Sequence, residues 1–116
     1  MRIKRGTLKN RRHNKYLKEA KGYRGSRSKL YRSAREGVEK AHSHAYKDRR
    51  RKKREFRKLW ITRINAGARQ HGLSYSEFMT GLRRMDVQMN RKVLADMAVR
   101  DKSGFAKLAE MAKTKV

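Results

Sequence analysis

Six consecutive cations, Arg49 to Arg54 in the stretch YKDRRRKKREFRKLW, constrain the fold of this chain more than any other feature. The residues on both sides are strong helix formers, so the stretch is expected to be helical. Each residue of an α-helix turns by about 100°, and six of them therefore reach every side of the axis. Such a helix has no face to bury against protein, and we expect anions to surround it on several sides.

The charge of the whole chain indicates a polyanionic partner. Its 116 residues carry 35 Lys and Arg against 10 Asp and Glu, a formal net charge of +25. Residues 1–59 hold 24 of these cations and 16 apolar side chains, whereas residues 60–116 hold 11 cations and 26 apolar side chains. We therefore expect a basic helical extension at 1–58 and a small globular helical domain at 59–116. Nucleic acid is the expected polyanion, and an anionic membrane surface is the second option.

The absence of proline and the excess of helix formers predict an all-α fold. The expected architecture is a long basic N-terminal helical extension, made of a short helix, a hinge and a long helix, joined to a small C-terminal helical bundle. Residues 1–6 are expected to form an extended tail. Thr7 is expected to cap the short helix, which ends near Lys21, and Ser26 to cap the long one, which ends at Gln70–Gly72.

A thin stripe of mostly small apolar side chains follows one face of the long helix, and we expect a bend or a close approach at one of its two glycines, Gly37 or Gly67. The stripe consists of Leu30, Ala34, Val38, Ala41 and Ala45, and it thickens from Phe56 through Trp60, Ile64 and Ala68, with Leu59 and Ile61 beside them.

Three capping signals divide the C-terminal part. Ser74 and Glu77 form a capping box before a helix expected at Tyr75–Met85, and Asn90 and Ser103 are expected to cap two more. The side chains expected to face inward are Phe78, Met79, Leu82, Val93, Leu94, Met97, Ala98, Phe105, Leu108, Ala109 and Ala112, and Met85, Met89 and Met111 are expected to fill the core.

Cations interleaved with aromatic residues are typical of nucleic-acid binding. Lys and Arg neutralise phosphates, aromatic rings stack on unpaired bases, and glycines let the backbone approach a phosphate. The candidate nucleic-acid-binding residues are Arg2, Lys4, Arg5, Arg11, Arg12, His13, Lys15, Tyr16, Lys18, Lys21, Gly22, Tyr23, Arg24, Gly25, Arg27, Ser28, Tyr31, Arg32, Arg35, Tyr46, Arg49, Arg50, Arg51, Lys53, Arg54, Arg57, Trp60, Arg63, Arg69, Arg83, Arg84, Arg91 and Lys92. The competing interpretation is a solvated helix, with Asp48 and Glu55 as the ion-pair partners of its cations.

Other functional classes find little support. There is no cysteine, and His42 and His44 are two residues apart rather than the four that a helical zinc pair requires, so we predict no metal and no cofactor. No catalytic set of residues is evident, and we predict no enzymatic activity. No apolar run reaches the roughly 18–20 residues of a membrane span, and the charged N-terminus does not resemble a signal peptide, so a soluble intracellular protein is expected.

Six segments follow one another along the chain and together cover nearly all of it: KRG, AKGYRGSRS, YRSA, AYKDRRRKKREFRKLWITRINAGAR, GLSYSEFMTGL and NRKVLADMA. In this order they resemble the bacterial large-subunit ribosomal protein L-twenty family. The resemblance departs from the family pattern at Gly67, where alanine is common. It implies that the extension penetrates large-subunit ribosomal RNA and that the residues above bind that RNA.

The resemblance also implies partners and a location. They are large-subunit ribosomal RNA, neighbouring ribosomal proteins such as L-thirteen and L-twenty-one, and the protein's own messenger RNA, through which the family represses its translation. It further implies early subunit assembly in the cytoplasmic ribosome. From composition alone, a sequence-specific DNA-binding protein with a helix-turn-helix and a basic arm stays open. A membrane-active helix requires a wider apolar face than this chain has.

Overall fold

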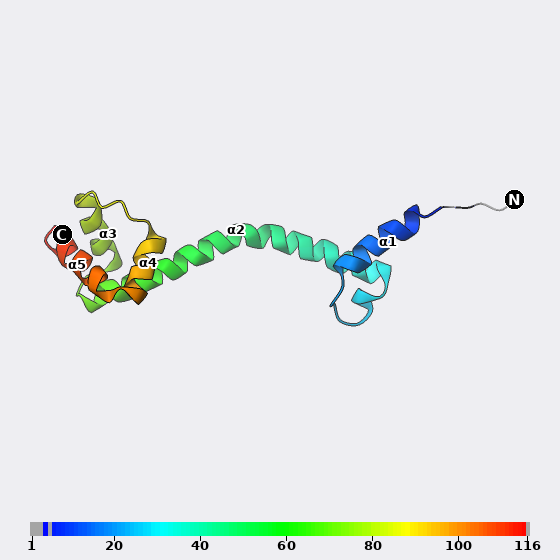
Figure 1. Cartoon of the computed structure of the whole chain (residues 1–116), viewed down its shortest axis with the longest axis horizontal. Helices are drawn as coiled ribbons and strands as arrows, with labels where there is room; N and C mark the ends of the chain where they lie inside the picture. Colours follow the sequence, from blue (N-terminus) through cyan, green and yellow to red (C-terminus); the bar gives the residue numbers. More distant parts are fainter. Residues whose placement is uncertain (1–3, 5, 116) are drawn as a thin grey trace. The chain divides into compact units, whose positions relative to one another are not determined.

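The computed structural model describes Lys4 and residues 6–115, so most of the predicted tail at 1–6 lies outside the described residues. The described part of the chain is helical and contains no strand, which confirms the all-α prediction (Figure 1). Its elements are α1 (Leu8–Glu19), the 3-10 helix η1 (Gly25–Ser28), α2 (Tyr31–Gln70), α3 (Tyr75–Arg84), α4 (Arg91–Arg100) and α5 (Lys102–Lys113). None of these helices is both long and apolar enough to cross a membrane.

The chain divides into two compact units, residues 1–50 and 51–116, and the division lies within the six-cation stretch of α2. Helix α2 has 40 residues and contributes to both units. The expected division into a binding extension at 1–58 and a globular domain at 59–116 stays a prediction about function.

The first unit has a very small core, which consists of Ala20, Ala34 and Val38. Because these side chains are small, α1 and α2 can approach closely, with Tyr16, Leu17 and Tyr23 packed around them. A Cβ on Gly37 would lie 3.3 Å from the Tyr23 ring, which confirms the predicted close approach. Leu30, predicted to belong to this stripe, is 60% exposed because it precedes the first residue of α2 and nothing in the described unit covers it.

The second unit has the larger core. It is built from the end of α2 together with α3, α4 and α5, and its buried residues are Ile64, Ala68, Leu73, Phe78, Leu82, Leu94, Ala95, Phe105, Ala109 and Ala112. The rings of Phe78 and Phe105 stack with centroids 5.0 Å apart. A Cβ on Gly67 would lie 2.9 Å from the Phe105 ring, so a close approach is present at both glycines, although the sequence predicted it at only one of them.

Local signals located most helix starts in this unit. The capping box is present: the Ser74 N–H donates to Glu77 Oε2 at 2.7 Å, and the Glu77 N–H donates to Ser74 Oγ at 3.3 Å. Asn90 caps α4, because its Oδ1 accepts from the Val93 N–H at 2.9 Å. The prediction for Ser103 is wrong: α5 begins at Lys102, two residues earlier than a Ser103 cap would place it, and Asp101 caps it by accepting from the Gly104 N–H at 2.9 Å.

Two capping predictions in the first unit also fail. The Thr7 side chain makes no cap hydrogen bond at the start of α1. Ser26 lies in η1 rather than at the start of α2, because the backbone turns there and the Ser26 carbonyl accepts from the Leu30 N–H at 2.8 Å.

Some apolar residues expected in the core are exposed. Val93 is 43% and Met111 49% exposed, although Leu94 and Ala112, their neighbours in sequence, are buried. Phe56 and Leu59 are 45% and 42% exposed, because the core of the second unit begins at Trp60. Adjacent residues on a helix differ by about 100° in direction, so packing decides which of two apolar neighbours is covered.

Candidate nucleic-acid interface

The six cations from Arg49 to Arg54 are all exposed on α2. The Arg50 guanidinium lies 4.9 Å above the Tyr46 ring, and the Lys52 ammonium lies 6.0 Å from the Phe56 ring. Arg51 and Lys58 both pair with Glu55, with N–O distances of 3.5 and 3.6 Å. Exposed pairs of this kind contribute little energy and leave most of the positive charge available to a ligand.

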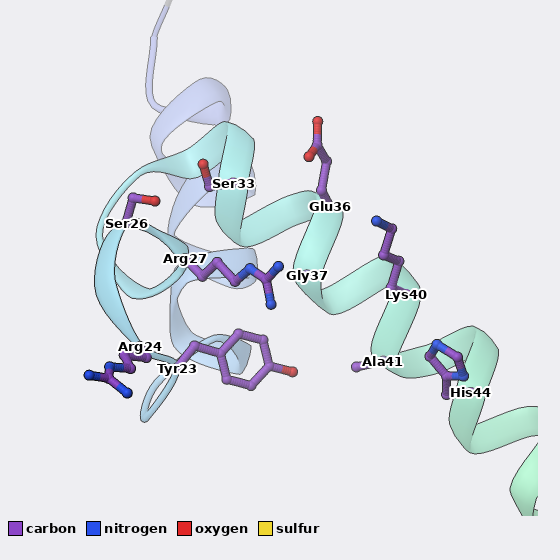
Figure 2. Close-up of a pocket in the computed structure, with 10 residues that line it drawn as sticks. All are labelled: Tyr23, Arg24, Ser26, Arg27, Ser33, Glu36, Gly37, Lys40, Ala41 and His44. Carbon is purple, nitrogen blue, oxygen red and sulfur yellow. The ribbon is translucent and has the colours of Figure 1, made fainter.

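The hinge between α1 and α2 is formed by two glycines in left-handed backbone conformations. Gly22 has φ of 88° and Gly25 has φ of 67°, values that other residues rarely adopt. They place Tyr23 and Arg24 between two sharp changes of chain direction, with the Tyr23 ring beside Gly37 of α2 and the Arg24 side chain pointing away from the helix (Figure 2). The Ser28 hydroxyl donates to the Gly25 carbonyl at 3.0 Å, so it stabilises the turn.

Contacts between side chains occupy part of the predicted surface on α1 and the start of α2. The rings of His13 and Tyr31 stack with centroids 3.7 Å apart, so one face of each is covered. The Arg35 Nε donates to Glu39 at 2.7 Å, and this hydrogen bond and the charge of Glu39 raise the pKa of the guanidinium above its ordinary value. Arg32 lies 4.0 Å from Glu36, a weaker contact.

In the second unit the predicted cations have different surroundings. Arg91 is half-buried, and its Nε donates to the Tyr75 hydroxyl at 2.8 Å, which gives it a structural role. Arg84 donates to the carbonyl of Lys115. The Arg69 Nε donates to Asn65 Oδ1 at 3.3 Å. The exposed cations of the predicted set in this unit include Arg54, Arg57, Arg63, Arg83 and Lys92.

The other predicted residues lie mainly on the surface of the first unit. Arg2 and Arg5 lie outside the described residues. The exposed ones are Lys4, Arg11, Arg12, Lys15, Lys18, Lys21, Arg24, Arg27 and Tyr46, whereas Tyr16, Tyr23 and Trp60 are half-buried.

A groove between the hinge and α2 adds residues that sequence reasoning missed. It has a volume of about 750 Å³, and Ser33, Lys40 and His44 line it together with the predicted Tyr23, Arg24 and Arg27 (Figure 2). Spacings of four residues, as in 33, 37 and 41 or 36, 40 and 44, place these positions on one side of a helix. That periodicity is visible in the sequence, but the hinge that completes the groove is not.

The described residues include no cluster of three or more His, Cys, Asp or Glu side chains that could hold a metal ion. His42 instead lies 3.2 Å from the Glu19 carboxylate of α1, and His71 lies beside the Phe105 ring with centroids 6.4 Å apart.

Comparison with known proteins gives a consistent result. Residues 2–108 match the family described as ribosomal protein L20. The chain is 65% identical over 116 residues to the large ribosomal subunit protein bL20 of Nitratidesulfovibrio vulgaris strain Miyazaki F, which covers 100% of this chain and 99% of that protein. It is 62% and 60% identical, with the same coverage, to the bL20 proteins of Oleidesulfovibrio alaskensis and Lawsonia intracellularis. The chain belongs to the ribosomal protein L20 family, a family of structural ribosomal proteins and not of enzymes.

Proposed function

We propose that this protein is a structural constituent of the large ribosomal subunit and that it binds large-subunit ribosomal RNA, chiefly through residues 1–58. The observation that carries the proposal is the exposure of all six cations from Arg49 to Arg54, around the full circumference of α2. No buried residue of either core lies in this stretch. Phosphates on several sides would neutralise these charges, of which only Arg51 has an ion-pair partner, Glu55, within the described chain.

The nature of the polyanion follows from two further observations. Aromatic rings accompany the cations, with Tyr46 beneath Arg50 and Phe56 beside Lys52, and aromatic rings stack readily on unpaired bases. Unpaired bases are common in folded RNA and rare in duplex DNA. The relatives are also named as large ribosomal subunit proteins, which favours ribosomal RNA and neighbouring ribosomal proteins as partners.

Competition at fixed salt tests the proposal. The full chain is bound to a folded fragment of large-subunit ribosomal RNA, and unlabelled RNA or duplex DNA of matched length is added. We expect the RNA to compete at a much lower concentration than the DNA. Equal competition would favour the alternative, a DNA-binding protein with a basic arm.

The salt dependence of binding tests the role of the cationic stretch. For about ten phosphate contacts, the logarithm of the affinity should fall against the logarithm of the salt concentration with a slope near −9. Replacing Arg49, Arg50 and Arg51 by glutamine should make this slope shallower by about 2.7, because each lost phosphate contact removes about 0.9.

The matched control replaces three exposed lysines of α5, Lys102, Lys107 and Lys113, by glutamine. This variant has the same net charge as the triple arginine variant, and its slope should change little. Equal changes in the two variants would mean that only the total charge matters and that the stretch has no special role. Early assembly of the subunit and binding to the protein's own messenger RNA stay predictions from family resemblance.

A further inference from the structure

The groove between the hinge and α2, here called the hinge groove, has the size and lining of a ligand site. Its volume of about 750 Å³ lies within the range of about 300–1,000 Å³ that is usual for such sites. One wall is formed by residues 23–27 of the hinge and the other by residues 33–44 of α2 (Figure 2). All of these residues belong to the first unit, which has its own small core.

One part of the hinge groove is flat and largely apolar. Gly37 and Ala41 present almost no side chain from α2, and the Tyr23 ring lies against Gly37, 3.3 Å from the position that a Cβ would take. Tyr23 is half-buried, because it also packs against the core of Ala20, Ala34 and Val38. The ring is therefore held in place, and it remains partly accessible from the groove.

The rest of the lining is cationic. Arg24, Arg27 and Lys40 line the groove, and none of them forms an ion pair with another part of the described chain. The only carboxylate in the lining belongs to Glu36, which lies 4.0 Å from Arg32. The Arg27 side chain extends from the hinge towards Gly37 (Figure 2), and its Cδ lies 3.9 Å from the position of a Gly37 Cβ.

We propose that the hinge groove binds one unstacked nucleotide of RNA, with the base against Tyr23, Gly37 and Ala41 and the phosphate held by Arg27 and Lys40. This inference rests on the proposed RNA-binding function and names one site within it. A fixed aromatic ring beside unpaired cations is the combination by which proteins bind unpaired nucleotides. A free phosphate would use the cations and leave the apolar wall empty, and a base pair inside a helix has no exposed face to offer Tyr23.

Filling the groove without changing charge tests the inference. Ala41→Leu places three more carbon atoms in the groove, and leucine has a helix propensity close to that of alanine. The control is Ala45→Leu, the same substitution one turn further along α2 at a position that does not line the groove. The full-length proteins are bound to a folded fragment of large-subunit ribosomal RNA, and the accessibility of each base is measured by chemical probing.

We expect wild type and Ala45→Leu to protect one unpaired base that Ala41→Leu leaves reactive. The other protections and the salt slope should be the same in all three proteins, which also shows that the variant is folded. The affinity of Ala41→Leu should fall by about 5- to 150-fold, the loss that corresponds to one base stacked on an aromatic ring.

Two results would overturn the inference, and they differ in what else they affect. If Ala41→Leu has the footprint and affinity of wild type, the groove holds no base, although the proposed function stands. If wild type protects no base of the fragment, both the function and the inference fail. Should Ala41→Leu lose every protection, Lys40→Gln decides, because it removes one phosphate contact: a salt slope shallower by about 0.9 supports the site, and an unchanged slope contradicts it.

Discussion

The contact between α3 and α5 at Gly81 allows a prediction whose sign depends on two opposing effects. Gly81 is buried in α3, and a Cβ added there would lie 2.7 Å from the carbonyl oxygen of Ala112, 2.8 Å from its Cβ and 2.9 Å from its Cα. Replacing glycine by alanine inside a helix normally stabilises it by about 1 kcal/mol. The steric overlap at Gly81 acts in the opposite direction.

The overlap should be the larger effect. Two of the three crowded atoms belong to the backbone of α5, which cannot rotate away as a side chain could. Relieving the contact requires α3 and α5 to separate, and overpacking of this kind costs about 1–3 kcal/mol. Because the backbone is involved, we take the upper value of about 3 kcal/mol for overpacking and subtract the gain of about 1 kcal/mol in helix propensity. Gly81→Ala should therefore lower the free energy of unfolding by about 2 kcal/mol. For a domain of this size, that corresponds to a fall in Tm of about 8–16 °C.

The fluorescence of Trp60 provides the assay. It is the only tryptophan of the chain, and it packs against the core of the second unit, so its emission on heating reports that unit within the full-length protein. The control is Thr80→Ala, which changes the adjacent exposed residue of α3. If Gly81→Ala melts at the same temperature as this control or higher, α3 and α5 tolerate the extra carbon and the reasoning from close packing is wrong.

Three more predictions concern the same unit and can be followed by the same fluorescence in urea. Phe78→Ala should lower the free energy of unfolding by about 3–5 kcal/mol, because it leaves a cavity beside Phe105 in a fully buried site. Ser74→Ala should lower it by about 1 kcal/mol through loss of the α3 cap, whereas Ser76→Ala, an exposed neighbour, should have little effect. Below pH 4.5 the unit should lose stability in part through Glu77. The Ser74 backbone N–H, and secondly its hydroxyl, lower the pKa of this carboxyl from 4.5 in the folded state, so the stabilisation is complete above 4.5 and is lost as the pH falls through the lowered pKa. Glu77→Gln should reduce this loss of stability at low pH. If the free energy of unfolding of the variant falls with pH below 4.5 as steeply as that of wild type, Glu77 is not responsible for the loss.

Features that depend on neighbours in sequence were predictable. The capping box of Ser74 and Glu77 and the cap at Asn90 involve residues three positions apart, and both are present. The end of α2 at Gln70 was predictable for the same reason, because the signal that ends the helix, Gly72 with φ of 75°, lies two residues further along the chain. The failure at Ser103 is also local in origin: Asp101 and Ser103 are both good caps, and the choice between them depends on where α5 begins.

Features that depend on packing between distant segments were not predictable. Val93 and Leu94 are adjacent and equally apolar, and only the positions of the surrounding helices determine that Leu94 is the buried one. The hinge groove has the same origin. Nothing in the sequence distinguishes Lys40 and His44 from the other basic residues and histidines of the chain. They line the groove together with Tyr23 only because the chain reverses at Gly22 and Gly25.

The three-residue core of the first unit has a consequence for how genetic data on this protein should be interpreted. Ordering a residue costs about 1–2 kcal/mol of backbone entropy, and Ala20, Ala34 and Val38 bury too little surface to offset that cost for a whole unit. If RNA supplies the remainder, part of the binding energy goes into folding the protein. A survey that scores only growth would then group substitutions of Ala34 with those of the arginines, although the Ala34 side chain is fully buried in the core and is not exposed to a ligand. Osmolytes that favour compact chains should rescue substitutions of Ala34, which weaken the folding of the unit, and should not rescue substitutions of the arginines, which remove contacts with RNA.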